Sequence, residues 1–268
     1  MEIRIKTELN KKETEDVLFL LETGKKKDSS ALSFPFGDRR AKYFLCYESG
    51  KLLSVLVLCQ IDDDVYECIA WTSPEYRSMG YFHLLWKEAS RMVRNGLFPS
   101  EKVRIHFIWD HRCPEAEHVI RSLHALPLTE EYQLSAVLPS PEISGQNTFS
   151  GCEGKEFQCR LLREESDGTR KYAVGFSNGQ DSGPILEFSV IPGSRNKNCY
   201  LFDLTVRKEL RGQKYGSRIF PLILSFLYEE GFRYLSLQVS SSNIPAVRLY
   251  KNAGLKTDVT LSYYEMIL

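Results

Sequence analysis

The chain has 268 residues, of which 43% are hydrophobic and 26% are charged, and its 35 Lys and Arg residues balance 35 Asp and Glu residues. This composition is typical of a globular protein long enough for two domains. A net charge of zero gives no general attraction to nucleic acid or to an anionic membrane. The sequence has no apolar run long enough to span a membrane, and its N-terminus lacks the apolar core of a signal peptide.

The N-terminal half has a strand, a turn and an amphipathic helix in succession. An apolar run leads into the turn Arg77-Ser-Met-Gly80, and apolar residues then recur on one helical face over 82–93. A strand over 103–109, a helix that begins near Pro114 and an alternating strand over 132–138 follow. Residues 139–155 are rich in Pro, Ser and Gly and lack apolar periodicity, which predicts a linker.

The C-terminal half repeats this order. A strand over 200–206 leads to the turn Arg211-Gly-Gln-Lys-Tyr-Gly-Ser217 and to a helix with one apolar face. A strand over 234–239, a helix start at Pro245 and an alternating strand over 261–268 follow. We therefore expect two domains built on one plan, over residues 1–138 and 156–268.

The halves differ after their first strand. The N-terminal half contains the helix-like segment Glu13–Leu21 there, whereas the C-terminal half has only the short polar turn Glu164–Thr169 before the strand Tyr172–Phe176. The sequence thus predicts one helical layer fewer in the C-terminal half.

Seven cysteines are present, without a Cys-x-x-Cys pair, and several lie in apolar strand-like runs. Buried, reduced thiols of this kind are typical of a cytoplasmic protein, which is our expectation. His106, His111, Cys113 and His118 are close in sequence, but their spacing fits no standard zinc pattern, so we expect no metal site.

The turn at 211–217 has the features of an anion site. Backbone N–H groups at a strand-to-helix turn, together with the helix dipole, favour a pyrophosphate. Downstream, residues 242–255 read Ser-Asn-Ile-Pro-Ala-Val-Arg-Leu-Tyr-Lys-Asn-Ala-Gly-Leu. The two segments resemble the signature motifs of the GNAT superfamily, which transfers acyl groups from acyl-CoA to amines. Its usual turn is Arg/Gln-x-x-Gly-x-Gly/Ala: Arg211 and Gly216 match, and Lys214 replaces the first glycine. Lys214 either adds positive charge beside the phosphates or weakens their binding.

The resemblance implies a fold of two tandem GNAT-like domains in the α/β (α+β) class, each a mixed, mostly antiparallel sheet flanked by helices. The motif is degenerate in the N-terminal half, where Phe82 replaces the last glycine and no tyrosine matches Tyr250. The implied function is transfer of an acyl group, acetyl above all, from CoA to a small-molecule or peptide amine by direct attack. The alternative is a CoA-binding sensor or structural module with eroded catalysis. A nucleotide-binding protein is disfavoured because Gly-x-x-x-x-Gly-Lys-Ser/Thr is absent.

The same resemblance implies roles for individual residues. Tyr250 donates a proton to the leaving thiolate, or else packs against the sheet. Asp203 and Glu187 are candidate bases, because a carboxylate on a strand is costly unless it has a partner or a task. Asn243 contacts the cofactor or caps the following helix. The remaining expected acyl-CoA contacts are Leu204, Thr205, Val206, Arg211, Gly212, Gln213, Lys214, Tyr215, Gly216 and Ser217.

Overall fold

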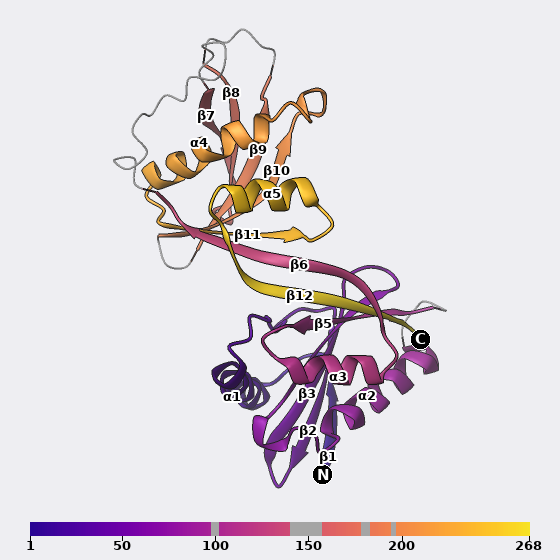
Figure 1. The fold of residues 1–268 in the computed structure, drawn as a ribbon. Helices are drawn as coiled ribbons and strands as arrows, with labels where there is room; N and C mark the ends of the chain where they lie inside the picture. The colour runs from indigo at the N-terminus through magenta and orange to yellow at the C-terminus, as the bar shows by residue number, and fades with distance from the viewer. Residues whose placement is uncertain (98–101, 140–156, 178–182, 194–196) are drawn as a thin grey trace. The chain divides into compact units, whose positions relative to one another are not determined.

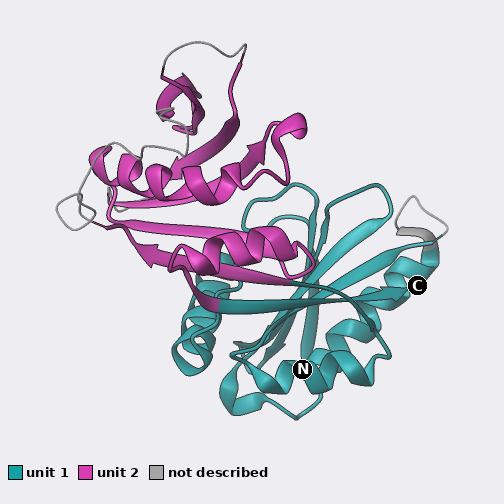
Figure 2. Cartoon of the chain, turned by 45° about the horizontal axis from the view of Figure 1, so that its top comes forward, with its two compact units in different colours: residues 1–130, 259–268 teal, residues 131–258 magenta. Residues whose placement is uncertain are grey.

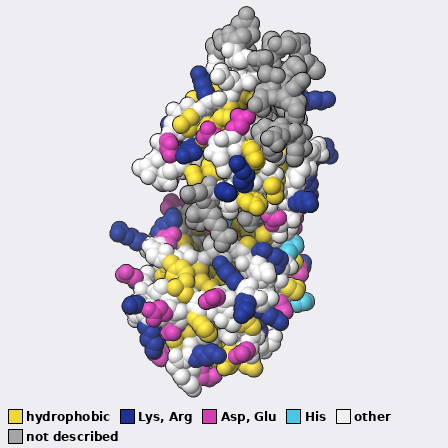
Figure 3. Space-filling model, turned by 90° about the vertical axis from the view of Figure 1, so that its left-hand side faces the viewer, with side chains coloured by type: hydrophobic (Ala, Val, Ile, Leu, Met, Phe, Trp, Pro, Cys, Tyr) yellow, Lys and Arg dark blue, Asp and Glu magenta, His cyan; other side chains and the backbone are white. Residues whose placement is uncertain are grey.

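A computed structural model describes residues 1–97, 102–139, 157–177, 183–193 and 197–268 (Figure 1). Apart from Pro139, the predicted linker lies outside these residues. The chain forms two compact units (Figure 2): unit 1 comprises residues 1–130 and 259–268, and unit 2 comprises residues 131–258. No helix in the described part is long and apolar enough to cross a membrane. On the face shown in Figure 3, basic and acidic side chains lie interspersed.

Unit 1 is a mixed sheet in the order β1-β2-β3-β4-β5-β12. Its α1 packs on one face of the sheet through Val17, Leu20 and Leu21, and α2 forms part of a separate core cluster with Leu85 and Trp86. The elements of its N-terminal part are β1 (Glu2–Lys6), α1 (Lys11–Asp28), β2 (Ala41–Glu48), β3 (Lys51–Gln60), β4 (Val65–Thr72), α2 (Tyr81–Met92), a π-helical turn (Val93–Leu97), β5 (Arg104–Asp110) and α3 (Pro114–Ser122).

Unit 2 is a mixed sheet in the order β6-β11-β10-β9-β8-β7. A large cluster of its buried apolar residues contains Ile219, Phe220 and Ile223 of α4 together with strand residues such as Phe188 and Leu201. The elements of the C-terminal part of the chain are β6 (Leu126–Val137), β7 (Phe157–Glu164), β8 (Arg170–Phe176), β9 (Leu186–Pro192), β10 (Asn198–Val206), α4 (Tyr215–Glu229), β11 (Tyr234–Ser240), α5 (Ile244–Asn252) and β12 (Lys256–Ile267), of which β12 belongs to the sheet of unit 1.

The predicted fold class is confirmed. Among the strand pairs registered in the described residues, β4 with β5 and β10 with β11 are parallel, and the others are antiparallel. The predicted difference between the halves is also present, since α1 lies between β1 and β2 whereas only a turn joins β7 to β8.

The last strand of each half lies in the sheet of the other unit. Strand β12 pairs with β5, with Leu261 opposite Asp110, and β6 pairs with β11, with Val137 opposite Tyr234. The compact units therefore differ from the sequence intervals 1–138 and 156–268 by these two strands. Alternating apolar residues specify which face of a strand is buried, but they do not specify its neighbour.

Candidate functional site

Each unit contains a turn of the same conformation between corresponding strands and helices, before α4 in unit 2 and before α2 in unit 1. In unit 2, Gly212 and Lys214 have positive φ angles of 77° and 62°, and α4 begins at Tyr215. In unit 1, Ser78 and Gly80 have φ angles of 61° and 85°, and α2 begins at Tyr81. Each turn thus contains two left-handed residues at equivalent positions, and one of the two is not glycine.

Lys214 occupies the N-cap position of α4 in a conformation that glycine adopts more readily. A left-handed conformation costs a residue with a Cβ about 1–2 kcal/mol. Among the described residues, no side chain makes a capping hydrogen bond at this end of α4, and the N–H groups of a first helical turn have no partner within the helix. The positive end of the helix dipole is therefore available to an anion.

Arg211 and Gln213 brace the unit 2 turn. The Arg211 Nε donates to the Val206 carbonyl over 3.0 Å, and the Gln213 Nε2 donates to the Glu209 carbonyl over 2.9 Å. Both side chains are exposed, as are Gly212 and Lys214. These contacts hold the end of β10 against the turn that precedes α4.

Strands β10 and β11 separate before they reach this turn. Their parallel pairing runs from Asn198–Tyr234 to Tyr200–Ser236, although β10 continues to Val206. The pairing of β10 with β9 shifts register between Phe202 and Thr205. Leu204, Thr205 and Val206 therefore follow a bulge and have no registered partner on β11.

Asp203 lies at this bulge, with a φ of 52°, and its side chain is exposed. Because its side chain is exposed at this bulge, the carboxylate of Asp203 avoids most of the desolvation cost that a regular buried strand position would impose. Glu187 lies opposite Thr205 on β9, and its carboxylate is 2.6 Å from the Lys171 Nζ. The salt bridge with Lys171 supplies the partner that Glu187 needs on the strand.

Tyr250 is the seventh residue of α5 and is 7% exposed. Its ring centroid is 5.2 Å from that of Phe220, so the side chain also belongs to the core. Burial raises the pKa of Tyr250 to about 12, which keeps the phenol protonated at neutral pH. Asn243 caps α5, since its side-chain oxygen accepts from the Ala246 N–H over 3.3 Å.

The four clustered His and Cys residues do not converge. His106 Nε2 lies 3.2 Å from a carboxylate oxygen of Glu265, and His111 stacks on Trp109 with 3.9 Å between ring centroids. Burial raises the pKa of the Cys113 thiol to about 11, so it is not a ready nucleophile.

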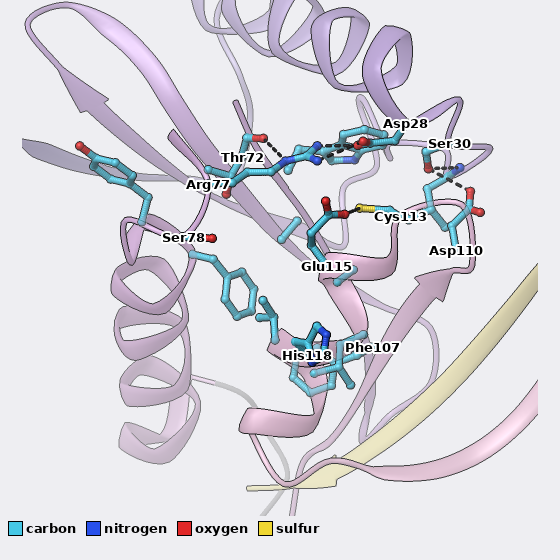
Figure 4. A pocket seen from close by; sticks show the side chains of 18 of the residues that line it. Asp28, Ser30, Thr72, Arg77, Ser78, Phe107, Asp110, Cys113, Glu115 and His118 are labelled. Atoms are coloured by element: carbon cyan, nitrogen blue, oxygen red, sulfur yellow. Dashed lines mark hydrogen bonds and ion pairs between the residues drawn. The ribbon is translucent and has the colours of Figure 1, made fainter. Parts of the chain in front are cut away.

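Unit 1 contains a cavity that the sequence analysis missed (Figure 4). It lies beside the turn before α2 and receives side chains from β4, β5 and α3. At one end, Arg77 donates to both carboxylate oxygens of Asp28, the last residue of α1. The glycine at position 80, in the turn equivalent to 211–217, was the available signal for this site.

Residues 127–255 match the family model of the acetyltransferase (GNAT) family. No curated protein matches the chain in sequence. Among solved structures, a GCN5-related N-acetyltransferase from Sphaerobacter thermophilus has a TM-score of 0.72 and 13% identity, with 99% of this chain and 95% of that chain covered. A tandem GNAT protein from the clavulanic acid biosynthesis pathway has a TM-score of 0.71 and 12% identity, with 99% and 98% covered. These similarities show that the chain has the tandem GNAT fold.

Proposed function

We propose that this protein, which belongs to the GNAT family over residues 127–255, transfers an acyl group from acyl-CoA to an amine at a site in unit 2. The observation that carries the proposal is the combination of an uncapped α4 N-terminus, the separated strands β10 and β11, and Tyr250 within one matched interval. Acetyl-CoA is the proposed donor, and the acceptor is a small-molecule or peptide amine.

Different segments of the unit 2 site are proposed to bind different parts of the acyl-CoA donor. The N–H groups of residues 212–217 would hold the pyrophosphate, and the exposed cations Arg211 and Lys214 add favourable charge beside it. The backbone of Leu204, Thr205 and Val206 would bind the amides of the pantetheine arm, because this stretch has no registered partner on β11. Asn243 contributes by fixing the start of α5, on which Tyr250 lies.

Tyr250 is the proposed proton donor. The acceptor nitrogen attacks the thioester carbon, the carbon–sulfur bond breaks, and the phenol gives its proton to the departing thiolate. A pKa of about 12 leaves the phenol fully protonated at neutral pH and able to return to that state. The proton that the amine loses passes to solvent, or to Glu187 or Asp203, the two carboxylates proposed as bases.

A CoA-binding module without catalysis is the second candidate. Two observations favour it: Lys214 replaces a turn glycine, and the described residues of unit 2 form no counterpart of α1, which in unit 1 reaches the cavity with Asp28. A site with fewer walls positions an acceptor less well, and positioning supplies much of the rate of a two-substrate reaction.

Turnover of the full chain distinguishes these functions. Release of CoA thiol from acetyl-CoA is measured with a panel of primary amines, and calorimetry measures acetyl-CoA binding separately. Tyr250→Phe should lower turnover about 100-fold or more while acetyl-CoA affinity stays near the original value. Tyr264→Phe, which removes a hydroxyl from another buried tyrosine, should leave turnover unchanged. Binding without turnover for every amine would support the second candidate, and no binding would exclude both.

A further inference from the structure

The cavity of unit 1 is largely apolar where its walls are buried and polar where they are exposed. Its volume of about 440 Å³ is within the range of small-molecule sites. The buried lining residues include Trp71, Phe107 and Ile120, whereas Glu115 and His118 of α3 are exposed. The buried walls therefore favour a ligand whose own surface is largely apolar.

The charged side chains at one end of the cavity are paired with each other (Figure 4). Arg77 donates through both terminal nitrogens to the carboxylate of Asp28, and these side chains are only 21% and 8% exposed. Asp110 accepts from the Arg112 guanidinium and from the Ser30 hydroxyl. A charged ligand would lose its hydration at this end without gaining a free counter-charge, which is costly. An uncharged ligand avoids this cost.

Two hydroxyl groups of the lining residues also have partners within the protein. The Thr72 hydroxyl lies 2.9 Å from that of Ser54. The Tyr81 hydroxyl donates to a carboxylate oxygen of Glu48 over 3.1 Å. These groups, like the hydroxyl of Ser30, do not require a ligand to satisfy them.

Trp71 differs from these residues, because its indole Nε1 is buried without a partner in the described part of the chain. The Trp71 side chain is 6% exposed and lines the cavity. Its ring packs closely against α1, since a Cβ at Gly24 would lie 2.7 Å from the Trp71 Cε3, and it has little room to turn toward another acceptor. A buried N–H group without an acceptor is costly, and an oxygen atom of a bound ligand would remove that cost.

We propose that the unit 1 cavity binds an uncharged, largely apolar small molecule that presents a carbonyl oxygen to the indole Nε1 of Trp71. A carbonyl oxygen accepts a hydrogen bond without bringing a donor that needs a partner of its own. Aryl ketones, esters and tertiary amides have this chemistry. Ile120, which holds in α3 the seventh position that Tyr250 holds in α5, adds buried apolar surface. This inference goes beyond the proposed function, which assigns acyl transfer to unit 2.

Three phenyl compounds of similar size test this ligand class on the full chain. Acetophenone carries the carbonyl group, ethylbenzene lacks it, and benzoate adds a negative charge. The three tryptophans, Trp71, Trp86 and Trp109, give three indole N–H signals in a proton–nitrogen NMR spectrum, and Trp71→Phe identifies the first. Acetophenone at millimolar concentration should move the Trp71 signal downfield in a saturable way, because the N–H group gains an acceptor. Ethylbenzene should cause no downfield movement, and benzoate should not move the signal.

The other two indoles serve as controls in the same spectrum. The Trp109 Nε1 already donates to the Cys113 carbonyl over 3.0 Å, so its signal should stay in place. Trp71→Phe removes the proposed hydrogen bond together with part of the ring. Its effect on ethylbenzene measures the change of shape alone. Acetophenone affinity, measured by ligand-observed NMR, should therefore fall about fivefold more than ethylbenzene affinity in this variant.

A matched pair of variants assigns the binding to this cavity. Ala116 lines it as the third residue of α3, and Ala246 is the third residue of α5. Ala116→Leu should weaken acetophenone binding about tenfold or more by filling the cavity, whereas Ala246→Leu should leave it within about twofold. Unchanged Trp86 and Trp109 signals in the free variant show that Ala116→Leu is folded, and if they are lost the Trp71→Phe comparison decides.

The proposal is overturned if acetophenone leaves the Trp71 signal in place or if benzoate moves it equally. It is also overturned if Trp71→Phe weakens the binding of acetophenone and ethylbenzene by the same factor, or if Ala246→Leu abolishes binding and a folded Ala116→Leu does not. Turnover does not enter these measurements, so their failure and a failure of the proposed acyl transfer are distinguishable.

Discussion

The arginines before the two helices show how differently the units support the same turn. In unit 2, the Arg211 Nε donates to the carbonyl of Val206, the last residue of β10, over 3.0 Å. In unit 1, the Arg77 Nε makes the corresponding but longer bond to Thr72 over 3.5 Å, and its terminal nitrogens bind Asp28. In both units the arginine therefore links the turn to the end of the preceding strand, and in unit 1 it also links the turn to the end of α1.

The parallel strands after these turns end differently as well. Strand β5 ends at Asp110, a buried carboxylate that accepts from the Ser30 hydroxyl, the Ala31 N–H and the Arg112 guanidinium. Strand β11 ends at Ser240, whose hydroxyl contacts that of Ser242 at the surface. Unit 1 thus uses the carboxylate of Asp110 to hold the segment after α1, and the described residues of unit 2 contain no counterpart of that segment.

The largest expected effect comes from Asp110→Asn. This change removes the charge from a buried set of hydrogen bonds to Arg112 and Ala31, and it should lower the free energy of unfolding by about 3 kcal/mol. The matched change Ser240→Ala at the end of β11 should cost less than about 0.5 kcal/mol, because its hydroxyl is not buried. Urea unfolding measures both values, and equal costs would contradict the comparison.

The same carboxylate should make unit 1 sensitive to acid. Burial tends to raise the pKa of Asp110, but hydrogen bonds from Arg112 and Ala31 outweigh it and lower the pKa below its usual value. Its contribution to stability is therefore present above the unfolded pKa of about 4 and is lost as pH falls through the lower folded value. The free energy of unfolding of Asp110→Asn, measured by urea unfolding at several pH values, should therefore fall less on acidification than that of the original protein.

A smaller effect is expected from Gly24→Ala in α1. A Cβ at Gly24 would lie 2.7 Å from the Trp71 Cε3, and the Trp71 ring is buried. Overpacking costs about 1–3 kcal/mol, and the better helix propensity of alanine returns about 1 kcal/mol, so a net loss of about 1 kcal/mol follows. Gly175→Ala in β8 meets no atom within 4 Å and should be neutral or slightly stabilising. If Gly24→Ala raised the free energy of unfolding, the close contact between α1 at Gly24 and the Trp71 ring of β4 would be contradicted.

An effect of about the same size separates the two interpretations of Lys214. Lys214→Gly removes a left-handed residue with a Cβ and should raise the free energy of unfolding by about 1 kcal/mol. It also removes a cation beside the proposed phosphate site, so acetyl-CoA affinity in calorimetry should fall about fivefold, more at low than at high salt. A rise in affinity would show instead that the lysine obstructs the turn.

The amino-acid sequence predicts the secondary structure around the turns correctly. The strand over 200–206, the turn 211–217 and the amphipathic helix after it correspond to β10 and α4, because their periodicity and their glycines are local signals. The bulge at Asp203 was not predicted, since nothing in its neighbours distinguishes a regular strand from a shifted register. The unit 1 cavity was missed because it depends on Asp28 meeting Arg77, 49 positions away in sequence.

The place of β12 also decides the order in which the units can be completed during synthesis. All residues of unit 2 have left the ribosome once residue 258 has emerged. Strand β5 of unit 1, in contrast, can form its pairing with β12 only after residues 261–267 have been synthesised. A nascent chain usually folds its first domain first. Here the unit that begins at the N-terminus is finished last, and until then β5 carries an unpaired edge, the kind of surface on which aggregation begins. Loss of residues 259–268 should accordingly damage the unit in which the chain begins.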